Sequence, residues 1–339
     1  MDPVSQGVLG AVAALSIAKP NHSRLAALLG CAGGMLADLD ILIRSSEDPL
    51  LNIEYHRHFS HSLAFIPIGG LIAALVFLPL LRKRLKPVAI YLYSTIGYAT
   101  AGLLDSCTSY GTQLLWPFSN ARISWSIISI IDPLFTVPLL AMALLAVVKN
   151  RPIFGKSAAV FAIAYLSLGV IQNRRANSFL ESIIANRGHE PATRLTVKPS
   201  IANLVLWRSL YLYEGHYYVD AVRVGFFGEN LIYPGSKLPA FDTQAALDSV
   251  KPSSPIADDL QRFEHFSEGY LAALPDEPSF ITDLRYSAIP NSIAPLWGID
   301  ISNTNASGHA VFETRRDISQ SERKAFVQML TGRPVSASN

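Results

Sequence analysis

Histidine and aspartate residues gather at a few points of an otherwise apolar half of the chain. His56, His58 and His61 stand close together, and Asp38 and Asp40 precede them. Imidazole and carboxylate groups are the usual protein ligands of zinc, manganese and iron. His58 and His61 would share one face of a helix, whereas Asp38 and Asp40 could meet at one ion only at a frayed helix end. The pattern therefore predicts a metal site that is built from separate segments.

Apolar stretches that could cross a bilayer must position these residues. A membrane-crossing helix needs about 20 apolar residues. Four stretches approach that length, and a shorter one stands before and after them, so we expect about five or six membrane helices. The stretches are Val4–Ala18, Leu25–Ile43, Phe59–Leu81, Val88–Leu104, Ile127–Val148 and Ala158–Ile171.

The composition divides the chain in a similar way. Half of the 339 residues are apolar and only 16% are charged, against about 25% in soluble domains. After Asn173 the sequence resembles that of an ordinary soluble protein. We therefore expect an α-helical integral membrane domain over residues 1–173, a polar linker or surface helix over 174–190, and a small soluble α+β domain over 191–339. The net charge of +2 and the lack of a nucleic-acid motif indicate no nucleic-acid partner.

The C-terminal region carries strand and helix patterns. Ala202–Tyr213 and His216–Phe227 alternate and are rich in Val, Leu, Tyr and Trp, which predicts two strands. Glu214-Gly215 between them predicts a hairpin turn. Further strands are expected over Asp283–Ile289 and Trp297–Ile301, and helices over residues 242–274 and Ser319–Leu330.

Three basic linkers predict how the helices cross the membrane, because such loops stay in the cytoplasm. They are Lys19–Arg24, Arg82–Lys86 and Lys149–Lys156, and each falls between alternate pairs of apolar stretches. This order places the three linkers on the cytoplasmic side. The Asp and His residues and the C-terminal domain would then lie on the periplasmic side. Arg174 and Arg175 oppose this orientation mildly, and without the last span the C-terminal domain would be cytoplasmic.

The residue types suggest a role for each member of the group. We predict that the metal ligands are Asp38, Asp40, His56, His61 and Asp105. Two ions about 3.5–4 Å apart would suit phosphoester hydrolysis, although the same set could hold one. His58 or Asp132 would act as general base or orient the attacking water. Arg57 and Arg122 would hold an anionic part of the substrate, since a guanidinium matches phosphate.

Each residue also has a simpler structural interpretation. Asp132 precedes Pro133 and could start a helix. The arginines could contact lipid headgroups instead of a substrate. The joint placement of the acids and histidines on one face favours a site, because ionisable groups in membrane segments are rare and costly.

Several short segments resemble the YdjM-type family of inner-membrane metal-dependent hydrolases, which are also labelled LexA-binding, membrane-associated hydrolases. They follow the family's order and are Met1–Ser5, Ala37–Asp40, His56–Ser62, Leu104–Thr112, Trp116–Ser119 and Ile131–Phe135. The resemblance implies a protein of the bacterial inner membrane with a metal-dependent hydrolase activity. The ligand types favour zinc or manganese as the divalent cofactor. The family's acids and histidines correspond to Asp2, Asp38, Asp40, His56, His61, Asp105 and Asp132.

Two positions depart from the family pattern. Gln6 and Ala101 stand where many members carry histidine. Glutamine can coordinate through its carbonyl oxygen, but alanine cannot coordinate at all. Either the site holds fewer metal ions here, or the activity has drifted.

The leading hypothesis is a membrane-bound metal-dependent hydrolase. Its substrate would be an ester or phosphoester, including a lipid, at the outer membrane face. The alternatives are a metal- or proton-coupled transporter that uses the same cluster and a non-catalytic membrane scaffold. A transporter should hold its site near the bilayer midplane between broken helices. The acids of this chain crowd one edge of the spans, which favours the enzyme.

Reporter fusions test the predicted orientation. A reporter fused after Arg84 should lie in the cytoplasm, and one fused after Asn120 in the periplasm, because the basic linkers stay inside. Alkaline phosphatase, which is active only in the periplasm, distinguishes the two. The opposite pattern would place the Asp and His residues at the cytoplasmic face.

Overall fold

A computed structural model, which describes residues 1–305 and 307–335, divides the chain into two compact units. The first unit comprises Met1–Leu42, Tyr55–Ile171 and Ile201–Asn203. The second comprises Ile43–Glu54, Gln172–Ser200 and the chain from Leu204 onward. The division after Ile171 falls within a helix, so no separate linker joins the two units at that point.

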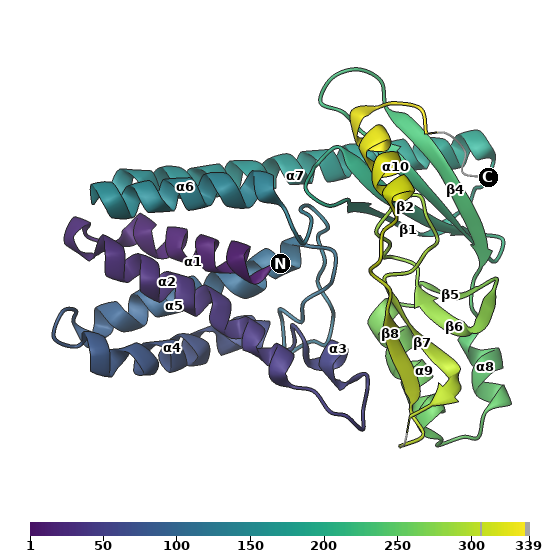
Figure 1. The fold of residues 1–339 in the computed structure, drawn as a ribbon, viewed down its shortest axis with the longest axis horizontal. Coiled ribbons are helices and arrows are strands. Elements are labelled where there is room, and N and C mark those ends of the chain that lie inside the picture. Colours follow the sequence, from purple (N-terminus) through teal and green to yellow (C-terminus); the bar gives the residue numbers. More distant parts are fainter. Residues whose placement is uncertain (306, 336–339) are drawn as a thin grey trace. The chain divides into compact units, whose positions relative to one another are not determined.

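The first unit is a bundle of apolar helices (Figure 1). Its longer helices are α1 (Pro3–Ile17), α2 (Ser23–Leu36), α4 (Ile66–Leu81), α5 (Pro87–Cys107), α6 (Pro133–Lys149) and the first part of α7 (Pro152–Arg187). Its short 3₁₀ helices are η1 (Pro20–His22), η2 (Ala37–Leu42), η3 (Phe59–His61) and η4 (Leu63–Phe65). Proline begins α1, α5, α6 and α7, as expected where the missing N–H would have no partner in any case.

Among the described residues, three helical stretches have the length and apolar composition of a membrane span, which is fewer than the five or six that the sequence predicts. They are Pro20–Leu42, Leu63–Leu81 and Pro152–Arg187. Helices α1 and α6 are apolar but shorter. The predicted stretch Ile127–Val148 becomes helical only at Pro133. Helix α5 is long enough, but it carries polar side chains such as Tyr93, Ser94 and Asp105.

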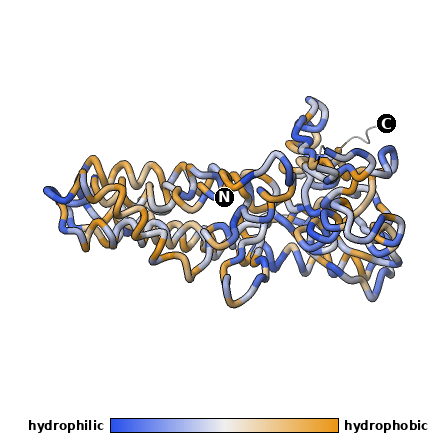
Figure 2. Tube along the Cα trace, turned by 90° about the horizontal axis from the view of Figure 1, so that it is seen from below, coloured by the Kyte–Doolittle hydropathy of each residue, from blue (hydrophilic) through white to orange (hydrophobic). Residues whose placement is uncertain are grey.

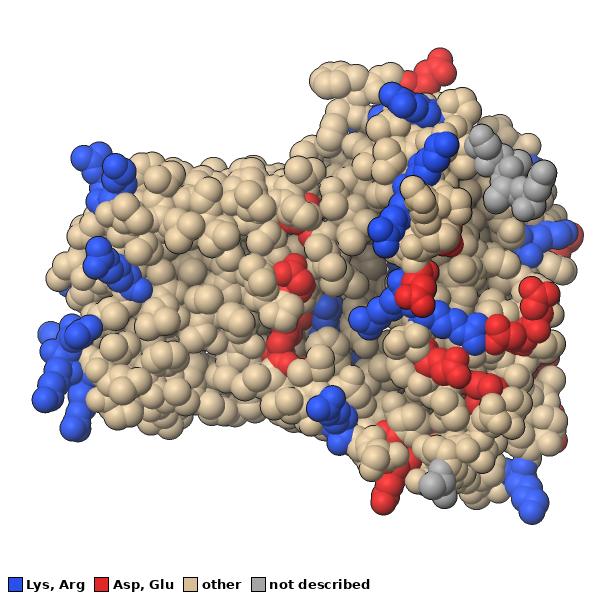
Figure 3. Space-filling view, viewed as in Figure 1, with Lys and Arg blue, Asp and Glu red and all other residues tan. Residues whose placement is uncertain are grey.

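In the first unit, charged side chains lie toward the two ends of the apolar helices. Its helices are largely apolar (Figure 2). The linkers α1–α2, α4–α5 and α6–α7 lie together at one end of the bundle (Figure 1). Lys and Arg side chains gather at that end, and acidic side chains lie toward the opposite end (Figure 3). The basic linkers therefore share one side of this unit, as their order in the sequence predicts.

Helices α1, α2 and α5 approach one another through glycine. A Cβ atom on Gly10 would lie 2.3 Å from the carbonyl oxygen of Gly30, and one on Gly30 would lie 2.3 Å from that of Gly10. A Cβ atom on Gly97 would lie 2.2 Å from the same oxygen of Gly30. Small residues permit such close contact between membrane helices. The contact leaves no room for a methyl group, so it depends on glycine.

The second unit contains two four-stranded antiparallel sheets, in the orders β1-β2-β3-β4 and β5-β6-β7-β8. The first sheet consists of β1 (Thr193–Pro199), β2 (Leu206–Tyr213), β3 (His216–Arg223) and β4 (Leu231–Pro239). The second consists of β5 (Leu271–Leu274), β6 (Glu277–Asp283), β7 (Trp297–Thr304) and β8 (Ala310–Thr314). The helices are α3 (Leu51–Tyr55), α8 (Thr243–Ser249), α9 (Pro255–Ser267), α10 (Gln320–Thr331) and the second part of α7.

The hairpin expected in the second unit is confirmed. Tyr213 pairs with His216 across a turn in which Glu214 and Gly215 have φ of 47° and 72°, the backbone of a two-residue hairpin turn. The predicted strand over Asp283–Ile289 is wrong, because β6 ends at Asp283. The Asp283 carboxylate accepts the backbone N–H of Arg285 and so turns the chain away from the sheet.

The second part of α7 packs on the first sheet. Residues 174–187, expected as a polar linker or surface helix, continue α7 without a break. Ala176, Leu180 and Ile184 are buried in one cluster with Trp207 and Val222. Apolar burial therefore makes this stretch part of the core of the second unit.

Replacing Gly30 tests the glycine contact. Gly30→Ala should lower the free energy of unfolding of the detergent-solubilised protein by about 1–3 kcal/mol, and with it the unfolding temperature, because the added methyl group would overlap the backbone of α1 at Gly10 and the side chain of Ala14. Leu28→Ala on the same helix, whose side chain is 48% exposed, is the control and should change the unfolding temperature little. Equal stability of the two variants would contradict the close approach.

Candidate metal centre

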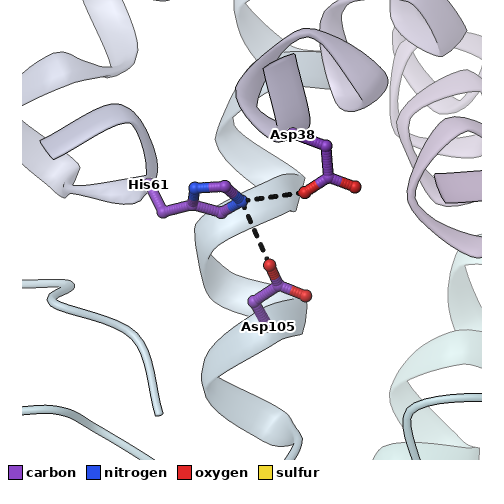
Figure 4. A group of neighbouring side chains, drawn as sticks. All are labelled: Asp38, His61 and Asp105. Carbon is purple, nitrogen blue, oxygen red and sulfur yellow. Dashed lines mark hydrogen bonds and ion pairs between the residues drawn. The ribbon is translucent and has the colours of Figure 1, made fainter. Parts of the chain in front are cut away.

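Three side chains from three separate elements meet at one nitrogen of an imidazole ring (Figure 4). His61, at the end of η3, has its Nε2 atom 3.2 Å from Oδ1 of Asp38 in η2 and 3.1 Å from Oδ2 of Asp105 in α5. The ligand atoms of the three residues lie within 4.8 Å of one another. His61 and Asp105 are buried, and Asp38 is partly exposed. One imidazole and two carboxylates form a donor set that could hold a metal ion.

The 3₁₀ turn of η2 explains how two acids two positions apart serve one ring. With three residues per turn, Asp38 and Asp40 point in different directions from the same short helix. Asp40 reaches the other nitrogen of His61, with its Oδ2 atom 3.1 Å from Nδ1. Carboxylates therefore lie at both nitrogens of the ring. A carboxylate on the far nitrogen is the usual way in which a metal-binding histidine is oriented.

Asp40 also holds the histidine-rich turn in place. Its Oδ1 atom lies 2.8 Å from Nδ1 of His56. Its Oδ2 atom accepts the backbone N–H of Arg57 at 2.9 Å and the hydroxyl of Ser60 at 2.7 Å. Both oxygens of this buried carboxylate are thus engaged by its neighbours, which separates Asp40 and His56 from the group around Nε2 of His61.

Arg57 has an unusual backbone conformation at the centre of this turn. Its φ of 63° lies in the left-handed region, which costs a non-glycine residue about 1–3 kcal/mol. The guanidinium is buried, with Nε 3.1 Å from Oδ2 of Asp105 and Nη1 donating to Oγ1 of Thr108 at 2.8 Å. The hydrogen bond to Asp40 and the ion pair with Asp105 stabilise the strained backbone. Arg57 therefore lies beside the candidate ligands as a partner of Asp105.

Arg122 lies on the same aromatic ring as Arg57. The guanidinium carbons of the two residues are 5.2 and 4.9 Å from the centre of the Tyr110 ring. Arg122 also donates to the carbonyl oxygens of Tyr110 and Gly111, at 3.4 and 3.1 Å. It is less buried than Arg57, so the structure brings both predicted substrate-binding arginines to one ring, with Arg57 buried and Arg122 partly exposed.

The two predicted catalytic residues lie in other surroundings. Asp132 caps α6, where it accepts the N–H groups of Leu134 and Phe135, and it also accepts the hydroxyl of Tyr165 at 2.8 Å. Within the described chain, no contact joins Asp132 to Asp38, His61 or Asp105. The helix-starting interpretation of Asp132-Pro133 accounts for the contacts with Leu134 and Phe135, and the contact with Tyr165 joins α6 to α7.

The ring of His58 lies among aromatic side chains. Its ring centre is 5.3 Å from that of Tyr55, 6.1 Å from that of Phe59 and 5.7 Å from that of Trp116. His58 therefore packs among aromatic rings and is not one of the three residues whose ligand atoms lie within 4.8 Å of one another, although it stands between His56 and His61 in the sequence.

Gln6 joins the site, although the sequence suggests it only as a departure from the family pattern. This fully buried residue of α1 donates from Nε2 to Oδ1 of Asp38 at 3.1 Å. Its carbonyl oxygen is buried without a hydrogen-bond partner in the part of the chain that the structure describes. Such an acceptor costs about 1–3 kcal/mol when unsatisfied. An adjacent cation would satisfy it, so the surroundings of the cluster fit a metal ion.

The balance of charge also fits a cation. The carboxylates of Asp38, Asp40 and Asp105 face the guanidinium of Arg57 and the amino group of Met1, which contacts Asp105. Three carboxylates thus face two positive groups, so one further positive charge, on a protonated His61 ring or on a bound cation, would balance the group. Buried charges are normally paired or bound to metal.

A second group of acids and a histidine lies in the second unit. Asp48, Asp259 and His309 also have ligand atoms within 4.8 Å of one another. However, Arg262 lies 2.9 Å from Asp48 and 3.3 Å from Asp259. Its guanidinium already supplies the positive charge that these carboxylates need, so this group is explained as an ion-pair network.

A helical bundle with apolar spans and a buried Asp/His cluster near the end of its helices defines a membrane protein with an internal candidate metal centre. The chain belongs to the YdjM inner membrane protein family, whose model matches residues 1–176. The matched part contains Gln6, Asp38, His61 and Asp105, so the resemblance seen in the sequence is confirmed. Searches of the curated proteins and of the solved structures found no match.

Metal content tests whether His61 and Asp105 share an ion. His61→Ala and Asp105→Ala should each lose bound metal in elemental analysis of the detergent-purified protein, because each removes a ligand from the same group. Asp40→Asn should weaken metal affinity about 10–100-fold, since it changes only the orienting partner of His61. His22→Ala, whose ring contacts Tyr93, should retain the metal. Loss from only one of the two ligand variants would show that they do not share an ion.

Proposed function

We propose that this protein is a membrane-bound metal-dependent hydrolase that acts on an ester or phosphoester, including a lipid, at the periplasmic face of the inner membrane. The observation that carries the proposal is the convergence of Asp38 and Asp105 on Nε2 of His61, beside the Asp40–His56 pair. A hydrolase needs a site for a cation and a group that can move a proton. The two halves of this cluster match those two needs.

Asp38, His61 and Asp105 would hold the ion. The mixed oxygen and nitrogen donors favour zinc or manganese. When bound, the ion would polarise the ester or phosphoryl oxygen and lower the pKa of water toward about 7. Asp40 would keep Nδ1 of His61 protonated, so that Nε2 presents its lone pair. Gln6 could add its carbonyl oxygen.

His56 is the side chain best placed to accept a proton. Its Nδ1 atom is held by Asp40, so the neutral ring presents Nε2 as the acceptor. The side chain is 22% exposed, and Nε2 has no hydrogen-bond partner among the described residues. A water molecule would give its proton to Nε2 as its oxygen attacks phosphorus or the carbonyl carbon. The departing alcohol would then receive the proton. This assigns His56 and Asp40, predicted as ligands, to proton transfer and orientation.

Arg122 remains the better placed of the two predicted arginines for an anionic substrate group. Arg57 is buried, and its guanidinium forms an ion pair with Asp105 within the cluster. The position of Asp105 also supports the enzyme over a transporter. Asp105 lies in the last turn of α5, which ends at Cys107, whereas a transporter site is expected near the middle of its helices.

Activity assays with matched variants test the proposal. The full-length protein in detergent, loaded with zinc or manganese, should hydrolyse members of a panel of nitrophenyl esters, nitrophenyl phosphodiesters and phospholipids in mixed micelles. His56→Ala should lower the rate about 10²–10⁴-fold while retaining the metal, because it removes only the proton acceptor. His61→Ala should lose both the bound metal and the hydrolytic activity.

His22→Ala is the control and should match the wild type. Metal retention without hydrolysis of any substrate class would contradict the hydrolase and favour a metal-binding scaffold or a transporter. Full activity of His56→Ala would contradict the proposed role of His56 as proton acceptor, but it would not contradict the hydrolase itself.

A further inference from the structure

Helix α7 is too long for a membrane span alone. Its 36 residues would extend about 54 Å, whereas the hydrocarbon core of a bilayer is about 30 Å thick. The apolar residues run from Pro152 to Ile171, and the next four are Gln172, Asn173, Arg174 and Arg175. If α7 crosses the bilayer, its exit point therefore lies near Gln172.

Gln172 ties a loop of the first sheet to this exit point. The side chain is fully buried, and its Nε2 atom donates to the carbonyl oxygens of Leu204 and Val224, at 3.0 and 2.9 Å. Val224 also packs with Ala176 of α7 in one buried cluster. The loop that follows Val224, residues 225–230, thus begins at the level where α7 becomes polar.

The tip of this loop is aromatic and exposed. Phe226 is 48% exposed and Phe227 is 92% exposed. Gly228 follows them with a φ of 83°, which forms a turn that leaves the two rings outside the core. Adjacent exposed aromatic side chains are characteristic of segments that enter the interface of a bilayer.

A basic cavity lies beside the same loop. It has a volume of about 440 Å³ and is lined by Arg174, Arg175, Ser178, Phe179, Ser182 and Asn230. Arg175 donates to Oε1 of Gln172 at 2.6 Å. Within the described chain, neither arginine forms an ion pair with a carboxylate, although Glu229 stands in the loop. Guanidinium, hydroxyl and amide groups together form a donor set that suits a phosphate.

We propose that this surface binds the membrane: the Phe226–Phe227 tip enters the bilayer interface, and the cavity holds the phosphate of an anionic phospholipid. The unpaired charges of Arg174 and Arg175 select an anionic lipid, because a juxtamembrane arginine gains attraction from a negative surface. The binding surface lies outside the His61 cluster and does not depend on hydrolase activity. It would hold the second unit against the leaflet at which α7 emerges.

Lipid binding by the full-length protein in nonionic detergent tests the cavity. Fluorescence anisotropy with labelled phosphatidylglycerol should show saturable binding that unlabelled phosphatidylglycerol displaces and phosphatidylcholine displaces poorly. Arg174→Gln/Arg175→Gln should weaken it about tenfold to thirtyfold. The control Lys251→Gln/Arg316→Gln removes two exposed charges elsewhere and should bind like the wild type. Equal weakening in the control, or displacement by inorganic phosphate at the same concentration as by the lipid, would overturn the proposal.

A fluorescent reporter tests the loop. Phe227→Trp, reconstituted in vesicles of phosphatidylcholine and phosphatidylglycerol, should add an emission component that brominated lipids quench. Phe241→Trp, in another loop of the second unit, is the control and should add an unquenched component. A component from Phe227→Trp that is quenched no more than that of the control would place the loop in water and overturn the proposal. Thermal unfolding of each variant verifies that it is folded.

Discussion

The first unit depends on one imidazole that has carboxylates at both of its nitrogens. His61 lies between Asp40 on Nδ1 and the pair Asp38 and Asp105 on Nε2. These contacts join η2, η3 and α5, which are distant in sequence, into a single end of the helical bundle. Buried carboxylates require such partners, because an isolated charge in an apolar interior is strongly unfavourable. The strained turn at Arg57 follows from the same requirement, since its backbone N–H and its guanidinium each satisfy an acid.

Close helix packing makes this arrangement attainable. The glycines Gly10, Gly30 and Gly97 let α1, α2 and α5 approach one another at the backbone, and Gln6 of α1 then reaches Asp38. Ala101, one turn before Asp105 in α5, is fully buried beside Ala37 and Tyr98. Ala101 is therefore a packing residue, and the three side chains that could hold an ion are Asp38, His61 and Asp105.

The family match covers the helical part of the chain. It ends at residue 176, within α7 and before the first strand. The proposed contact of the second unit with lipid gives that unit a role that is independent of chemistry. A hydrolase that acts on an amphiphile would benefit from such a contact, because substrate and enzyme would then share one surface.

The sequence by itself determined the classes of element and the residue types of a candidate site. Apolar stretches indicate helices, alternation with Glu214-Gly215 indicates a hairpin, and the acids and histidines predict Asp38, Asp40, His56, His61 and Asp105 as ligands. Their roles could not be assigned from spacing, because the sequence does not show which nitrogen of His61 Asp38 and Asp40 each reach, or which other groups they contact. The number of spans was overestimated because apolar stretches such as Ile127–Ile131 need not be helical. Only the tertiary structure decided that Gln6 of α1 contacts Asp38 of η2 and that Asp132 caps α6, since such contacts depend on how separate elements pack.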